Sequence, residues 1–142
     1  MKKITQIVFV FILLFATYSC SILKDTEPTK YQEYVYNNTL FIQNQATALI
    51  KESTHAFKAH ANQVNQLKRD ITIHYQFLKT NKYNHQLKIW DLIQDPNQNL
   101  LISYLDVWQK NDSISPALQN EFLLINNAYF NHLLSIEKYK NE

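Results

Sequence analysis

The stretch from Thr29 to Asn81 runs for about fifty residues without proline or glycine. Apolar side chains and two histidines recur along it at steps of three and four residues, which is typical of one buried face of a helix. This seam consists of Val35, Ile42, Ala46, Leu49, Ile50, Phe57, His60, Val64, Leu67, Ile71, His74 and Leu78. A single helix over 29–81 would be roughly 75 Å long and could not bury its own seam. The remainder of the chain must therefore pack against it.

All three prolines stand where a helix can begin. Pro28 precedes the long stretch, and Asp95-Pro96 and Ser115-Pro116 each join an N-capping residue to a first helical residue. The chain has no glycine, so turns that need a positive φ must use asparagine or be avoided. The asparagines at the predicted helix boundaries are Asn81, Asn84, Asn97 and Asn111.

Three further helices are predicted after the long one. The first carries Leu87, Trp90 and Ile93 and ends at Asp95-Pro96. The second begins there, ends near 111–113 and has its apolar face at Leu100, Leu101, Tyr104, Leu105 and Trp108. The third runs from Pro116 to about Lys140 with a seam at Leu118, Phe122, Ile125, Tyr129, Leu133 and Ile136. Leu123, Phe130 and Leu134 widen this last face, which predicts contact with two neighbours or with another copy of the chain.

These lengths predict an all-α fold. The three later helices together match the long one, so an antiparallel return would cover its seam. We expect an elongated antiparallel helical hairpin or bundle. In it, one long helix (29–81) is packed by a broken return arm of two short helices and one longer C-terminal helix. The weak break at 80–84 leaves open whether the long helix continues through Asn81 to Asn84.

The N-terminal residues have the pattern of an export signal. Lys2 and Lys3 precede the apolar run 7–16, and Thr17-Tyr18-Ser19-Cys20 follows it. This segment resembles the signal peptide and lipobox of bacterial lipoproteins. The resemblance implies cleavage before Cys20, lipid attachment to Cys20, and a division into a signal peptide (1–19), a lipidated tether (20–28) and a helical domain (29–142). An ordinary secretory leader or an uncleaved anchor is the alternative, and the helical body resembles no named family.

A lipidated Cys20 would place the protein in the cell envelope. By the same resemblance, Ser21 after the cysteine is compatible with the outer membrane, on its periplasmic or surface face. In a host with one membrane it would be the outer face of the cell membrane. The chain has 14 Lys plus Arg and 12 Asp plus Glu, and loss of Lys2 and Lys3 would leave 12 of each. This balance argues against a nucleic-acid partner and against an anionic-membrane surface.

Residues with catalytic or metal-binding chemistry are sparse. No two histidines have the i, i+4 spacing at which one helix holds a metal, although His60 and His132 could meet across helices. The single cysteine is assigned to the lipid, and a chain without glycine has no phosphate-binding loop. We therefore predict no enzyme activity, no cofactor and no metal site.

The tyrosines suggest an interface. Tyr31, Tyr34 and Tyr36 lie in the first turns of the long helix, near the predicted anchor, where tyrosine suits lipid headgroups or a partner protein. The leading hypothesis is a non-catalytic lipoprotein that binds another protein or serves as a structural accessory, either alone or as a homo-oligomer. The alternatives are a protective lipoprotein, acting in toxin immunity or surface exclusion, and a periplasmic metal or stress sensor using His60, His74 or His132.

Overall fold

The computed structural model describes residues 30–138, apart from the side chains at 30, 31, 137 and 138. The predicted signal peptide (1–19), Cys20 and the tether (20–28) lie outside this range. The described residues form five α-helices and one 3-10 turn. These elements are α2 (Lys30–Glu52), η1 (Phe57–Ala59), α3 (Ala61–Thr80), α4 (Asn84–Gln94), α5 (Leu101–Asn111) and α6 (Pro116–Lys138).

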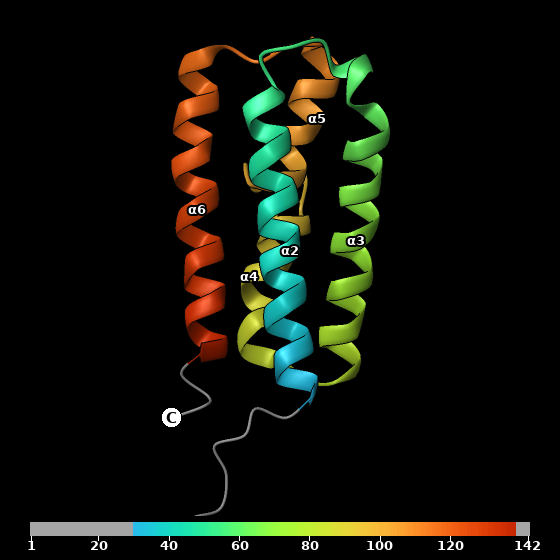
Figure 1. Ribbon diagram of the computed structural model, residues 1–142, viewed down its shortest axis with the longest axis vertical. Helices are drawn as coiled ribbons and strands as arrows, with labels where there is room; N and C mark the ends of the chain where they lie inside the picture. The colour runs from blue at the N-terminus through green and yellow to red at the C-terminus, as the bar shows by residue number, and fades with distance from the viewer. Residues whose placement is uncertain (1–29, 139–142) are drawn as a thin grey trace, which may run out of the picture.

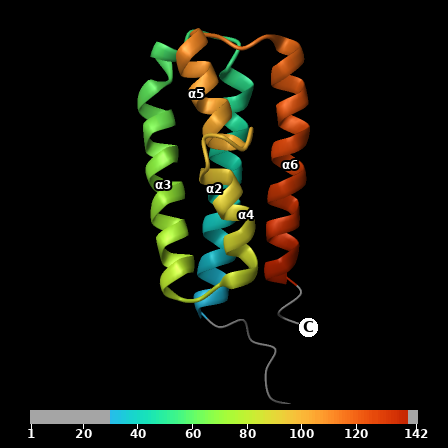
Figure 2. The same cartoon turned by 180° about the vertical axis from the view of Figure 1, so that it is seen from behind.

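The helices pack as four antiparallel arms, with α4 and α5 together making the third arm (Figures 1 and 2). The helix α2 lies between α3 and α6 and has its most extensive contacts with α6. It begins at the end of the bundle where α6 ends and where α3 turns into α4 (Figure 1). We call this the proximal end, and we call the opposite end, with turns 53–60 and 112–115, the distal end. The prediction of an all-α helical bundle is confirmed.

The prediction of one helix over 29–81 was wrong, because α2 ends at Glu52 and the chain reverses through 53–60 into α3. Ser53 begins the reversal, with its Oγ donating to the Ile50 carbonyl at 2.7 Å, and such local bonds compete with the helical pattern. The reversal lets α2 and α3 lie side by side, so Ile50 and Val64 are both fully buried. Phe57, in the turn itself, is only half-buried.

The break after Thr80 settles the boundary that the sequence left open. Asn81 ends α3, and its side-chain amide donates to the Phe77 carbonyl at 2.8 Å. The expectation that asparagine alone would supply positive φ was wrong. Lys82, Asn99 and Asp112 have φ of 61°, 53° and 65°, so one of the three is an asparagine. Aspartate tolerates this conformation for the same reason, a short polar side chain that bonds locally.

Of the two N-caps predicted before Pro96 and Pro116, the structure has one and lacks the other. Ser115 caps α6 as predicted, with its Oγ accepting from the Leu118 backbone N–H at 3.3 Å. Asp95 does not cap α5. Its Oδ1 accepts from the Asn97 backbone N–H at 2.8 Å, residues 96–99 form turns, and α5 begins at Leu101. The aspartate therefore stabilises a turn between two collinear helices.

The buried face of α6 differs from its predicted seam. Phe122 and Leu133 are buried as expected, but Leu118 and Ile125 are 40 % and 39 % exposed. Asn126 is fully buried instead, because its amide donates to Thr47 Oγ1 of α2 at 3.3 Å. The pairing with a second helix satisfies an amide that would otherwise be excluded from a core.

Phe130 shows why the apolar face of α6 is wide. It is fully buried and meets Trp90 of α4 edge to face, with ring centroids 5.9 Å apart. The helix α6 thus contacts both α2 and α4, which confirms the expected contact with two neighbours.

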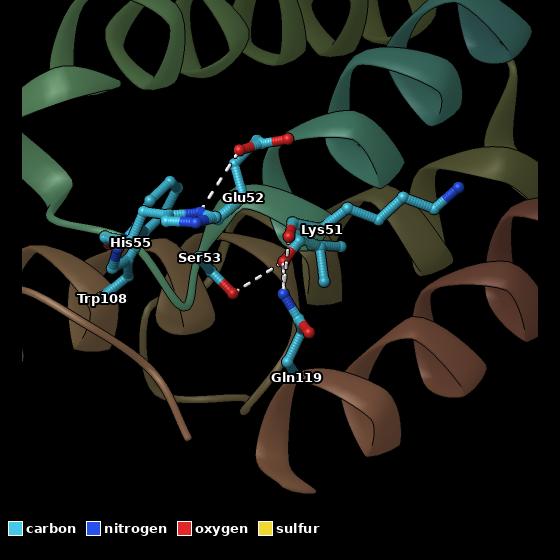
Figure 3. Close-up of polar contacts among 7 residues, drawn as sticks. Lys51, Glu52, Ser53, His55, Trp108 and Gln119 are labelled. Carbon is cyan, nitrogen blue, oxygen red and sulfur yellow. Dashed lines mark hydrogen bonds and ion pairs between the residues drawn. The ribbon is translucent and has the colours of Figure 1, made fainter. Parts of the chain in front are cut away.

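The two distal turns are joined to each other and to the end of α2. The Phe57 N–H donates to the Asp112 carbonyl at 2.8 Å, and the Ile114 N–H donates to the Ser53 carbonyl at 2.8 Å. In Figure 3, the Gln119 amide points at the last carbonyls of α2 and donates to that of Lys51 at 2.7 Å. These contacts satisfy backbone groups that a helix end leaves without intrahelical partners. The distal end is therefore an ordered cap.

Candidate docking surfaces

An apolar groove lies between α5 and the distal half of α6, which run side by side on the face shown in Figure 2. Its volume is about 260 Å³. The groove is lined by Asn99, Ser103, Tyr104, Val107, Leu118, Glu121, Phe122 and Ile125. We call this surface the α5–α6 groove.

Stacked aromatic rings form the floor of the α5–α6 groove. The rings of Tyr104 and Phe122 lie 4.1 Å apart between centroids, at an interplanar angle of 11°. The Tyr104 hydroxyl is 2.6 Å from Ser53 Oγ, and burial raises the pKa of this tyrosine. Because the Tyr104 hydroxyl is hydrogen-bonded to Ser53 in the core, only the apolar ring faces the groove.

The rim of the α5–α6 groove is apolar and open to solvent. Val107, Leu118 and Ile125 are 37 %, 40 % and 39 % exposed, and Glu121 adds one exposed carboxylate. Exposed apolar side chains that gather around a hollow are typical of protein-binding sites. The groove therefore has the chemistry of a docking site for an apolar side chain or helix face.

A second exposed apolar cluster lies on α2 and α3. Tyr34, Phe41 and Ile73 are 43 %, 55 % and 62 % exposed and border a pocket of about 90 Å³. Toward the distal end, the same two helices border a broader hollow of about 860 Å³ with many amide side chains. Asp70 lies between the two hollows, accepting from Gln45 at 3.1 Å and from Gln66 at 2.7 Å.

Of the three tyrosines predicted as an interface, the two whose side chains are described, Tyr34 and Tyr36, lie on different faces of α2. Tyr34 packs on Phe77 of α3, with ring centroids 4.5 Å apart. Tyr36 is 37 % exposed and, two residues further along the helix, points about 200° away from Tyr34. Tyr31 lies in the first turn of α2, and its side chain is outside the described part. Of the two described side chains, only that of Tyr34 belongs to the apolar cluster with Phe41 and Ile73.

The candidate sensor histidines lie apart. His74 is 2 % exposed, its Nε2 is 3.2 Å from Thr39 Oγ1, and its ring packs on Trp90 at 4.8 Å between centroids. His60 packs against Trp108 at the distal end, and His132 is exposed on α6. Within residues 30–138, no group of three or more His, Cys, Asp or Glu side chains is arranged to hold a metal.

The sequence pattern indicated the residues of these two docking surfaces only weakly. Phe41 and Ile73 are large apolar residues that stand beside the predicted seam, at positions which one buried helix face does not explain. Leu118 and Ile125 were assigned to the core, because they share a helical period with Phe122. Val107 of α5 gave no signal of its own.

No relative of the chain indicates what these surfaces bind. Among the described helices, none combines the length and the apolar character that a bilayer crossing requires. Comparison with protein-family models, with curated proteins and with solved structures gives no match to the chain.

Proposed function

We propose that this protein is a lipid-anchored envelope lipoprotein whose helical body holds another protein without catalysis. The observation that supports this function best is the α5–α6 groove, an apolar surface exposed at the distal half of the bundle. The chain enters the body at the proximal end, where α2 begins (Figure 1). An anchor at Cys20 would then leave the groove on the side away from the membrane.

The groove suits the apolar face of an amphipathic helix. From Leu118 to Ile125 it follows α6 for seven residues, which is about 10 Å or two helical turns. Apolar anchors at i and i+3 or i+4 of a partner helix would match this length. Glu121 on the rim would pair with a lysine or arginine of the partner.

Replacing Leu118 and Ile125 together by glutamine is expected to reduce partner capture at least about tenfold, because two of the three apolar rim residues are lost. The measurement is crosslinking in native envelopes, followed by purification of the protein and identification of what is attached. Leu124→Gln is the matched control, because Leu124 is 74 % exposed on the same helix outside the groove. It should capture the partner as the unmodified protein does.

Two results would contradict the proposal: capture of no protein by the unmodified chain, or equal capture by the double variant. The identity of the captured protein also separates an accessory role from a protective one. A toxin or an exclusion target in the groove would indicate protection, and a resident envelope protein would indicate an accessory.

The anchor has its own test. Cys20→Ser is expected to retain the leader and to lose labelling by radioactive palmitate, since the thiol is the acceptor of the lipid. Ser21→Ala is the control and should be processed and labelled normally. An unmodified chain that keeps its leader, or a Cys20→Ser chain that is still processed, would refute lipid anchoring.

A further inference from the structure

Positive charge gathers at the proximal end of the bundle. Between Asp70 and Asp91 the chain has no acidic residue, but it has Lys79, Lys82 and Lys88. The fold places Lys79 at the end of α3, Lys82 in the α3–α4 turn and Lys88 in the second turn of α4, and all three are exposed. The overall charge balance argued against an anionic-membrane surface, but the fold concentrates these lysines at one end, which is locally basic.

The acidic groups described near this end are few. Glu33 lies exposed in the first turn of α2. Asp91 lies two turns into α4, where its Oδ1 accepts the Tyr75 hydroxyl at 2.6 Å. Lys82 has a left-handed backbone conformation in the turn between α3 and α4. Among the described side chains of α3, α4 and the turn between them, exposed lysines therefore outnumber carboxylates at this end.

A cluster of aromatic rings lies at the same end of the bundle as these lysines. Phe77 is 4.5 Å from Tyr34 and 6.4 Å from Tyr83, measured between ring centroids, so the three rings join α2, α3 and the turn. Tyr34 is 43 % exposed. Tyrosine next to lysine is the combination that suits the boundary between water and lipid headgroups.

We propose that this proximal end docks on an anionic lipid surface, with Lys79, Lys82 and Lys88 facing the phosphates and Tyr34 at headgroup level. The inference rests on the proposed anchor for proximity, because the nine residues from Cys20 to Pro28 span at most about 30 Å. Lysine is attracted to an anionic membrane within a Debye length, and such a tether keeps the body near that range. Docking in this way would hold the bundle upright, with the α5–α6 groove away from the membrane.

The test is lysine footprinting of the full chain, isolated from producing membranes and reconstituted with vesicles. One set of vesicles is phosphatidylcholine alone, and the other also contains phosphatidylglycerol. Acetylation of Lys79, Lys82 and Lys88 is expected to be roughly threefold slower or more on the anionic vesicles, and the difference should vanish in high salt. Lys58 and Lys110 at the distal end are internal controls and should react equally on both.

A pair of variants checks that the lysines themselves cause the docking. In the unmodified chain, amide hydrogen exchange of the turn at 81–83 should slow on anionic vesicles, with turn 53–60 as the reference. Replacing Lys79, Lys82 and Lys88 by glutamine should abolish this slowing. Replacing Lys51, Lys58 and Lys110 by glutamine removes the same charge elsewhere and should preserve it.

Each outcome decides the proposal. Binding to both vesicle types with equal lysine reactivity overturns docking and leaves the anchor standing. Binding to anionic vesicles alone supports docking and overturns the anchor. Binding to neither overturns both. Lysine protection that arises from an acidic protein co-purified with the chain, and that persists without anionic lipid, assigns the basic end to that protein and overturns lipid docking.

Discussion

Lowering the pH from 6.5 to 4 is expected to reduce the free energy of unfolding by about 3 kcal/mol through His74 alone. Burial lowers the pKa of His74 from 6.5 to about 4. Between these values the unfolded chain binds a proton that the folded chain excludes, so acid favours unfolding. The contribution is fully present above pH 6.5 and is lost progressively as the pH falls toward 4.

The geometry around His74 explains the size of this effect. Its Nε2 meets Thr39 Oγ1, its Nδ1 has no hydrogen-bond partner among the described residues, and its ring packs against Trp90. A charged imidazolium would thus have a buried N–H without an acceptor. Protonation is therefore coupled to opening of the core.

Urea unfolding at several pH values measures the prediction. In His74→Gln the loss of stability between pH 6.5 and 4 should be smaller than in the unmodified protein by about the predicted 3 kcal/mol. His132→Gln removes an exposed histidine and should follow the unmodified curve. A His74→Gln protein with the same pH dependence as the unmodified one would show that His74 is not the titrating group.

Trp108→Ala is expected to lower the free energy of unfolding by about 3–5 kcal/mol. Trp108 is fully buried, packs edge to face on Phe57 at 5.4 Å between centroids, and donates its indole N–H to the His55 carbonyl at 3.0 Å. It supports the turn at 53–60 through this hydrogen bond, and Figure 3 labels Trp108 and His55 at the turn. Its removal leaves a cavity and an unpaired carbonyl together.

Chemical denaturation of two further variants separates these effects. Trp108→Phe keeps most of the ring volume and should lose roughly 1–2 kcal/mol, chiefly from the hydrogen bond. Val107→Ala truncates the adjacent, 37 % exposed residue and should lose under about 1 kcal/mol. A Trp108→Ala protein that is no less stable than Val107→Ala would show that the distal turn does not depend on the tryptophan.

The seam predicted the core well but could not show where the chain reverses. Val35, Ile42, Val64 and Ile71 are fully buried or nearly so. The same residues would be buried in a continuous helix packed on a partner and in two helices packed on each other, so periodicity does not distinguish the two. The reversal at 53–60 is stabilised by residues about fifty positions away, such as Trp108, which local sequence does not reveal.

The α5–α6 groove could not be predicted from the sequence, because it also depends on contacts between distant residues. Hydropathy places Ile125 inside and Asn126 outside, and the structure has the opposite arrangement. Asn126 is acceptable in the core because it bonds to Thr47 and accepts the Tyr129 hydroxyl at 2.8 Å. The Tyr129 contact lies within α6, but the Thr47 contact requires α6 to pack on α2, and no pattern local to α6 could have shown it.

The principal partner of α2 is α6, and these are the first and the last of the described helices in chain order. If the chain is exported from its N-terminus as we propose, α2 and α3 would emerge first, with the face of α2 that packs on α6 still uncovered. Closure of the bundle would wait until the final turns had cleared the secretion pore. In the proposed export, this order of the helices would keep the bundle from closing until translocation is complete.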